Sequence, residues 1–248
     1  MSRWIALRSI VYDTQTLQAG RAEVSGFFSR RLPRFSESIA TLTETEILRY
    51  LFDWSWSRAL ILAELGLTDR TKHALSVGAP FAIRNLKPGD VDAVLCDLQQ
   101  PAQSVALECK RVRVVSSESG SNRVNRLENF GRAHDQANAL AKLRFHRTFL
   151  TCIALADARL EPVPNFAVRG VSSATFQRLF DTAMSMPLEP EVGVLYIEFS
   201  QPVEASIDTA GCLSVGTLRL PRSQDQGEYL TSRVVNFMTE HGKGPTKP

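Results

Sequence analysis

Cysteine and histidine are scarce in this chain, and neither is clustered. The 248 residues include four cysteines and four histidines. Each cysteine stands alone within an apolar run, without the C-x-x-C spacing of a zinc site or the density of a disulfide scaffold. The histidines form no H-E-x-x-H pair, so zinc catalysis is unsupported. We expect reduced core residues at all four cysteine positions, Cys96, Cys109, Cys152 and Cys212.

Long apolar runs and a strong excess of one charge are also missing. No apolar run approaches the roughly 18 residues of a membrane span, and the charged N-terminal segment MSRWIALRSI is too short for a signal peptide. We therefore expect a cytoplasmic protein with no membrane partner. The net charge of +3 permits a nucleic-acid partner without requiring one.

Apolar periodicity divides the chain into the helices and strands of an α/β protein. Thr43 and Glu46 form a T-x-x-E capping-box pattern ahead of a helix expected over 43–65. Three strands should follow, then a helix over 123–145 and a fully buried strand. These four strands are expected over 79–84, 91–98, 105–115 and 148–156.

The same patterns suggest one core with additions at both ends. The hydrophobic fraction of 44% is enough for one sizeable globular domain. The C-terminal addition should contain two helices, near 172–185 and 226–239, and two strands, near 192–200 and 212–220. The expected divisions are an N-terminal extension (1–40), the core (41–160), a C-terminal α/β extension of the same domain (161–240) and a disordered tail (241–248).

Charged residues interrupt two of the strands that otherwise look buried. Residues two apart on a strand share a face, so Asp90 and Asp92 project together, and so do Glu108 and Lys110. If the two strands pair as a hairpin around 99–103, both charged pairs converge on one patch. Each pair alone could instead be an exposed ladder or a turn cap.

Carboxylates converging from adjacent strands have the chemistry of a magnesium site. Mg²⁺ is usually held by one or two carboxylates and keeps several waters, and Mn²⁺ accepts the same oxygen ligands. A lysine beside such an ion can orient an attacking water or offset charge in a phosphoryl transition state. The patch therefore suggests phosphodiester hydrolysis.

The stretch P-G-D-V-D-A-V-L, followed by E-C-K, resembles the PD-(D/E)XK nuclease superfamily, and its form is closest to the Holliday-junction resolvase-like and RecB-like branches. The expected element order αβββαβ is also the core of that restriction-endonuclease-like fold, a mixed central sheet flanked by helices. The resemblance implies that Asp92 and Glu108 hold the metal with the backbone carbonyl of Cys109. It makes Lys110 the catalytic lysine and Asp90 an auxiliary acid.

The resemblance extends to the neighbouring helices. Gln136-Ala-Asn-Ala-Leu140 has the Q-x-x-x-[YL] form of RecB-like members, in which the glutamine would orient Lys110 or the phosphate. Such nucleases often carry a glutamate on the first helix. Glu44, Glu46 and Glu64 are the candidates; Glu46 is favoured, although it could equally complete the capping box.

A set of arginines follows the E-C-K strand. They could form a rim that contacts phosphates, or they could be a solvated loop. Arg132 lies one helical turn before Gln136, so it could contact a phosphate. The candidate nucleic-acid-binding residues are Arg111, Arg113, Arg123, Arg126 and Arg132.

These observations predict a Mg²⁺-dependent deoxyribonuclease, an endonuclease, in which Mn²⁺ can substitute. The first alternative is an inactive nuclease-fold module that binds DNA or a partner protein. The second is an α/β protein with no nucleic-acid role, in which the charges are surface ladders. A homodimer, and a partner protein bound through the C-terminal extension, are compatible with the sequence. The choice between DNA and RNA, strandedness and pathway stay open.

Overall fold

A computed structural model describes residues 8–12, 42–78, 81, 91–116, 122–157, 171–200 and 211–244. Asp90 and most of the N-terminal extension lie outside these ranges. Among the described residues, no helix combines the length and apolar character needed to cross a membrane.

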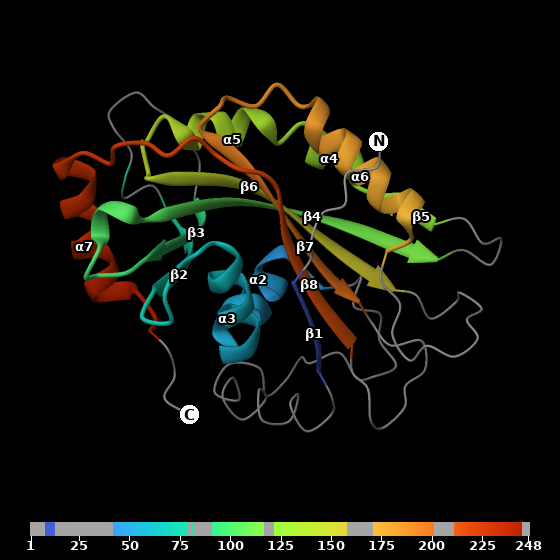
Figure 1. Ribbon diagram of the computed structural model, residues 1–248, viewed down its shortest axis with the longest axis horizontal. Coiled ribbons are helices and arrows are strands. Elements are labelled where there is room, and N and C mark those ends of the chain that lie inside the picture. The colour runs from blue at the N-terminus through green and yellow to red at the C-terminus, as the bar shows by residue number, and fades with distance from the viewer. Residues whose placement is uncertain are drawn as a thin grey trace.

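One mixed sheet runs through the molecule in the order β1-β8-β7-β6-β4-β3-β2, with β5 paired to β4 beside this path (Figure 1). The central β4–β6 and β6–β7 pairs are parallel, and the other pairs are antiparallel. The strands are β1 (Arg8–Tyr12), β2 (Lys72–Val77), β3 (Val91–Cys96), β4 (Val105–Ser116), β5 (Asn122–Asn125), β6 (Arg147–Asp157), β7 (Val192–Ser200) and β8 (Gly211–Arg219).

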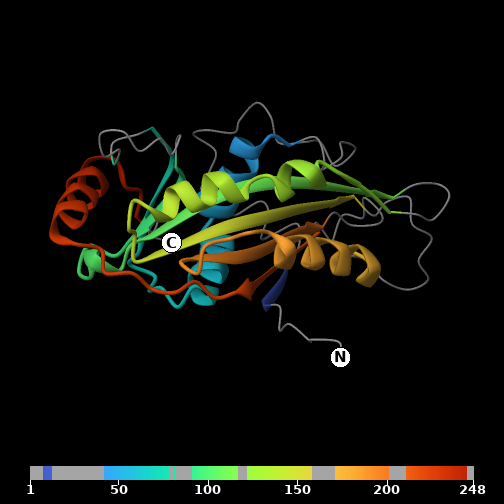
Figure 2. The same ribbon diagram turned by 90° about the horizontal axis from the view of Figure 1, so that it is seen from above.

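Helices cover both faces of this sheet. Helices α2 and α3 lie on one face, α4, α5 and α6 lie on the other, and α7 lies beside the β2 edge (Figures 1 and 2). A short 3₁₀ helix, Pro101–Gln103, lies between β3 and β4. The α-helices are α2 (Glu44–Asp53), α3 (Ser55–Glu64), α4 (Leu127–Gly131), α5 (His134–Ala141), α6 (Ser173–Ser185) and α7 (Glu228–His241).

Alternating strand residues build separate apolar layers on the two faces. Leu107 and Ile153 pack into the layer under α2 and α3, whereas Val112 and Cys152 pack into the layer under α4 and α6. A third cluster joins α5 and α7 to the β2 edge of the sheet. Of the cysteines, Cys96, Cys109 and Cys152 are free and buried, as expected.

The prediction of a mixed sheet flanked by helices is confirmed, and most strands lie where the sequence placed them. Within the described ranges, the first strand of the core is Lys72–Val77, which lies before the strand expected over 79–84. The sequence pattern did not predict this strand because Lys72 and His73 are polar. Ser76 also interrupts its extended backbone with a φ of 51°. Apart from Phe81, residues 79–84 lie outside the described ranges.

Two expected helices are each divided in two. The first breaks at Trp54, whose backbone is extended, and the Ser57 hydroxyl donates to the Tyr50 carbonyl across the break at 2.9 Å. The second expected helix begins instead as β5. Arg126 then adopts a φ of 69°, which turns the chain into α4.

Part of the segment expected to be a disordered tail packs against the sheet edge. His241 ends α7, and Lys243 forms an antiparallel bridge with His73 through two backbone hydrogen bonds of 2.9 Å. The Arg58 guanidinium donates to the Gly244 carbonyl at 3.2 Å. These contacts cover part of edge strand β2.

Gly193 on β7 lies where the sheet packs closely against the segment that follows β8, and a side chain has no room there. A Cβ at this position would lie 2.7 Å from the Phe149 ring and 2.7 Å from Pro221 Cδ. Because the Phe149 ring is buried, Gly193→Ala should lower the free energy of unfolding by about 1–3 kcal/mol. Gly131→Ala is the control, since its Cβ would meet Thr182 at an ordinary 3.7 Å. Urea unfolding gives the free energy of unfolding of both variants. A Gly193→Ala variant as stable as Gly131→Ala would contradict the prediction.

Candidate active site on strands β3 and β4

Asp92 lies where the ladder between β3 and β4 ends. The last paired residues are Ala93 and Leu107, and continuing that register would place Asp92 opposite Glu108, on one face of the sheet. Instead of a further ladder bond, an Asp92 carboxylate oxygen accepts the Cys109 N–H at 2.7 Å. The side chain therefore reaches the backbone of β4 beside the predicted lysine.

Glu108 and Lys110 meet on the neighbouring strand. Lys110 Nζ lies 2.5 Å from Glu108 Oε1, and the side chains are 20% and 6% exposed respectively. Asp92, Glu108 and Lys110 thus form one compact group at the end of the β3–β4 ladder. The expectation that charges from the two strands converge agrees with this geometry.

Burial and mutual repulsion govern the charge of this group. Burial, followed by the charge of Glu108, raises the pKa of Asp92 to about 7. Burial also raises the pKa of Glu108, although Lys110 opposes the shift. The pKa of Lys110 is raised as well: its hydrogen bond and charge interaction with Glu108, together with Asp92, outweigh its burial. Lys110 thus offsets one carboxylate and leaves the second without a full counter-charge.

Glu44, rather than the favoured Glu46, is the glutamate of the first helix beside this group. Glu44 Oε2 accepts the Arg111 N–H at 3.3 Å, and its charge raises the pKa of both Asp92 and Glu108. Glu46 bonds back to Thr43 in a complete capping box, with 2.8 Å between Thr43 N and Glu46 Oε2. Positions two apart on a helix point in different directions, so these two glutamates have different neighbours.

The third candidate, Glu64, lies elsewhere. Its Oε1 accepts the backbone N–H of Thr217 on β8 at 2.9 Å. This contact fastens α3 to the far half of the sheet.

The structure does not connect Gln136 with the lysine. Gln136 is exposed on α5, whereas Ala137, Leu140 and Ala141 form the buried side of that helix. No hydrogen bond within the described ranges joins Gln136 to Lys110 or Glu108. The Arg132 side chain is 80% exposed. Its Nη2 lies 3.9 Å from Oε2 of Glu128, four residues earlier in the chain.

The predicted arginine rim is divided. Arg111 is only 6% exposed, and its Nε and Nη1 atoms lack hydrogen-bond partners. It points to the face opposite Glu108 and Lys110, by strand alternation, and Arg113 shares that face. Arg126 is exposed. Arg123 has its backbone in β5, but its side chain lies outside the described residues, as does Asp90.

The oxygen atoms of Asp92 and Glu108 are the kind of ligand that a hard divalent cation such as Mg²⁺ prefers. In the described part of the chain, no group of three or more histidine, cysteine, aspartate or glutamate side chains could hold a metal ion. Mg²⁺, however, commonly takes only one or two protein carboxylates and fills its remaining positions with water. Asp92 and Glu108 supply that pair, and a cation between them would stabilise the charged forms that burial and nearby carboxylates disfavour.

Comparisons with known proteins add no family to this geometry. No protein-family model matches the chain, and neither the curated proteins nor the solved structures yielded a significant match. The function must therefore be inferred from the site itself.

The raised pKa of Asp92 makes a prediction about stability. A carboxyl whose pKa is higher in the folded chain than in the unfolded chain binds its proton more tightly when folded. Stability is therefore lost as the pH rises from about 4 to about 7. Asp92→Asn keeps an acceptor for the Cys109 N–H but has no charge to bury. Without divalent ions, this variant should match the wild type at pH 4 and exceed it by on the order of 2 kcal/mol at pH 8.

Urea unfolding in EDTA at both pH values measures this difference. Asp225→Asn, at an exposed aspartate, is the matched control and should follow the wild type throughout. An Asp92 variant no more stable than the wild type at pH 8 would show that the carboxylate is not strained by burial.

Proposed function

We propose that this protein is a metal-dependent nuclease that hydrolyses phosphodiester bonds in DNA. The observation that carries the proposal is the convergence of Asp92, Glu108 and Lys110 where β4 separates from β3. Asp92 contacts the Cys109 N–H between the other two residues at 2.7 Å, and Lys110 contacts Glu108 at 2.5 Å. Two partly desolvated carboxylates beside a lysine match the requirements of phosphoryl chemistry. Buried charge at this density is costly for a group with only a structural role.

The order of elements supports a restriction-endonuclease-like core. Helices α2 and α3 precede the antiparallel β2–β3–β4 meander, and α4 and α5 then cross over to β6, which pairs with β4 in parallel. This arrangement agrees with the αβββαβ order that the sequence resemblance implies. It positions the D…E-x-K residues on the second and third strands of the meander.

Each residue has a proposed role. Asp92, Glu108 and the Cys109 carbonyl would hold Mg²⁺ or Mn²⁺, which when bound would polarise the phosphate oxygens. Lys110 exchanges its contact with Glu108 for one with the attacking water or a phosphate oxygen. Glu44 keeps negative charge beside Asp92 and Glu108, and so favours the cation-bound state of the pair.

A second candidate is a nuclease-fold module that binds DNA without cutting it. The isolation of Gln136 from Lys110 favours this candidate, because the resemblance assigns the glutamine a role in orienting the lysine. Exposed Arg126 and Arg132 are available for phosphate contacts in either case. Turnover is the property that separates the two.

Cleavage of linear, circular, single-stranded and branched DNA, and of RNA, tests the proposal. The wild type should cut DNA in Mg²⁺ or Mn²⁺ but not in EDTA. Glu108→Gln removes a metal-binding charge and Lys110→Met removes the ammonium group. Each should slow cleavage by about 100-fold or more. Lys142→Met, at an exposed lysine after α5, should leave the rate unchanged.

The outcomes are distinct. DNA binding without metal-dependent cleavage would support the second candidate. A Lys110→Met variant that cuts at the wild-type rate would refute the proposed mechanism. Circular dichroism of each variant shows whether a lost rate reflects lost folding.

A further inference from the structure

Ser76 has a backbone conformation that is unusual inside a strand. Its φ of 51° lies in the left-handed region, which residues other than glycine rarely adopt. Among the described non-glycine residues, Arg126 and Arg144 also have a positive φ, but Arg126 precedes α4 and Arg144 follows α5. Ser76 instead lies within β2, with paired residues on either side. Such local strain persists only where the surrounding structure imposes it.

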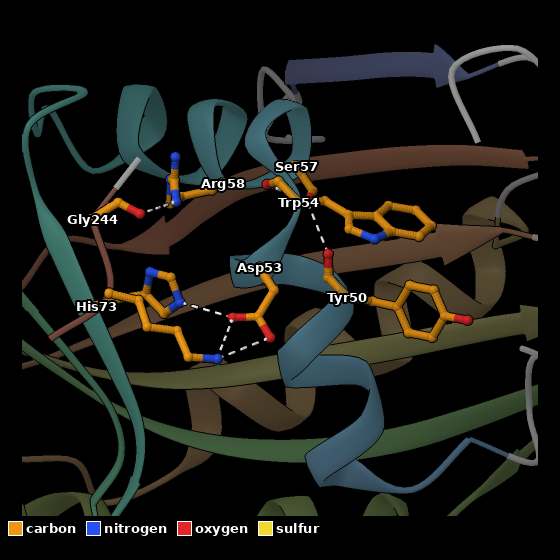
Figure 3. A network of polar contacts seen from close by, with 8 residues as sticks. Tyr50, Asp53, Trp54, Ser57, Arg58, His73 and Gly244 are labelled. Atoms are coloured by element: carbon orange, nitrogen blue, oxygen red, sulfur yellow. Dashed lines mark hydrogen bonds and ion pairs between the residues drawn. The ribbon is translucent and has the colours of Figure 1, made fainter. Parts of the chain in front are cut away.

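The residues before and after Ser76 are held by separate contacts. On the outer side of β2, His73 exchanges two backbone hydrogen bonds of 2.9 Å with Lys243. The His73 side chain points toward Asp53 on α2, and Nε2 lies 3.1 Å from Asp53 Oδ1 (Figure 3). After Ser76, the buried Val77 pairs with β3. The strand is therefore anchored on both sides of Ser76, and these anchors fix the path of the chain through it.

The conformation of Ser76 interrupts the β2–β3 ladder at the position opposite Asp92. The backbone N–H and C=O of His73 face outward, toward the C-terminal segment, so alternation turns those of Ser76 toward β3. An unbroken antiparallel ladder would therefore join Ser76 and Asp92 by two backbone hydrogen bonds. The register has paired residues on either side of this position but no Ser76–Asp92 pair.

Asp92 is thus outside the ladders on both sides of β3. On the β4 side, the last pair is Ala93 with Leu107, and the Asp92 carboxylate accepts the Cys109 N–H at 2.7 Å. A side chain in a regular strand stands roughly perpendicular to the sheet, whereas a backbone N–H at the edge of β4 lies in the plane of the sheet. The Asp92 carboxylate must therefore turn toward β4 to accept this hydrogen, and a backbone free of β2 permits that turn.

We propose that the left-handed backbone of Ser76 positions the Asp92 carboxylate beside Glu108 and Lys110, by keeping Asp92 out of the β2 ladder. Ser76 is a positioning residue, which acts through Asp92 and touches neither metal nor substrate. The backbone has this role, because the Ser76 side chain is exposed and has no hydrogen bond within the described ranges. The value of this positioning for catalysis rests on the proposed function, but the place of the carboxylate can be measured without metal.

Two substitutions in the full chain separate the backbone of Ser76 from its hydroxyl. Ser76→Thr keeps the hydroxyl but adds a β-branch, which disfavours a positive φ and so favours the extended backbone that pairs with Asp92. Ser76→Asn removes the hydroxyl, but asparagine tolerates the left-handed region. Arg144→Thr is the matched control, because it introduces the same β-branch at an exposed residue with a φ of 66° outside the ladders around Asp92.

Hydrogen exchange of the Cys109 amide in EDTA reports whether the Asp92 carboxylate still accepts that N–H. The amide of Ile153, on the central strand β6, is the reference that corrects for global unfolding. Relative to this reference, Cys109 should exchange about 10-fold faster in Ser76→Thr, since the cost of a left-handed residue corresponds to roughly that factor. Ser76→Asn and Arg144→Thr should keep the wild-type rate. The affinity for Mn²⁺, measured by calorimetry, should fall about 10-fold in Ser76→Thr alone.

A Cys109 amide that exchanges as slowly in Ser76→Thr as in the wild type would overturn the proposal. So would an equal acceleration in Arg144→Thr. An acceleration in Ser76→Asn as large as that in Ser76→Thr would assign the role to the hydroxyl and would also overturn it. If the wild type binds no Mn²⁺ but the Cys109 amide responds as expected, the positioning of Asp92 by Ser76 is supported and the proposed nuclease function fails.

Discussion

Strand β4 can separate from β3 after Leu107 because it stays paired in parallel with β6 from Val105 to Val115. That ladder supports the strand on one side and frees its other side. The Cys109 N–H therefore has no backbone partner on β3, and the Asp92 carboxylate accepts it instead at 2.7 Å. The β3–β4 register puts Glu108 on the same face of the sheet as Asp92. Lys110 shares that face because side chains two residues apart on a strand point the same way. The position of the charged group follows from where one ladder ends and the other continues.

The energetic balance of this group points to a ligand. Burial raises the pKa of both carboxylates, and Lys110 is a single cation between them. Apolar side chains of similar size would often stabilise a fold more than such a cluster does. In the proposed function, a divalent ion would supply the charge that the cluster lacks, and a phosphate would compensate the charge of Lys110.

Local patterns in the sequence predicted most of these elements, while long-range contacts decided the rest. The T-x-x-E pattern fixed the start of α2, and apolar runs located β3, β4 and β6. Strand β2 was missed because Lys72 and His73 are polar in sequence but contact α7 and Asp53 in the fold. Glu44 was considered but not preferred, since only its contact with the Arg111 backbone distinguishes it from Glu46.

The most direct test of the central claim is calorimetric titration of Mn²⁺ into the wild type, Asp92→Asn and Glu108→Gln near pH 7. We expect one site in the wild type, with proton release because the pKa of Asp92 is about 7 and the ion displaces its proton. Each variant should lose most of this affinity because either carboxylate alone is a poor site. Absence of binding in the wild type, or binding in either variant as tight as in the wild type, would contradict the claim that these charges converge to hold a cation.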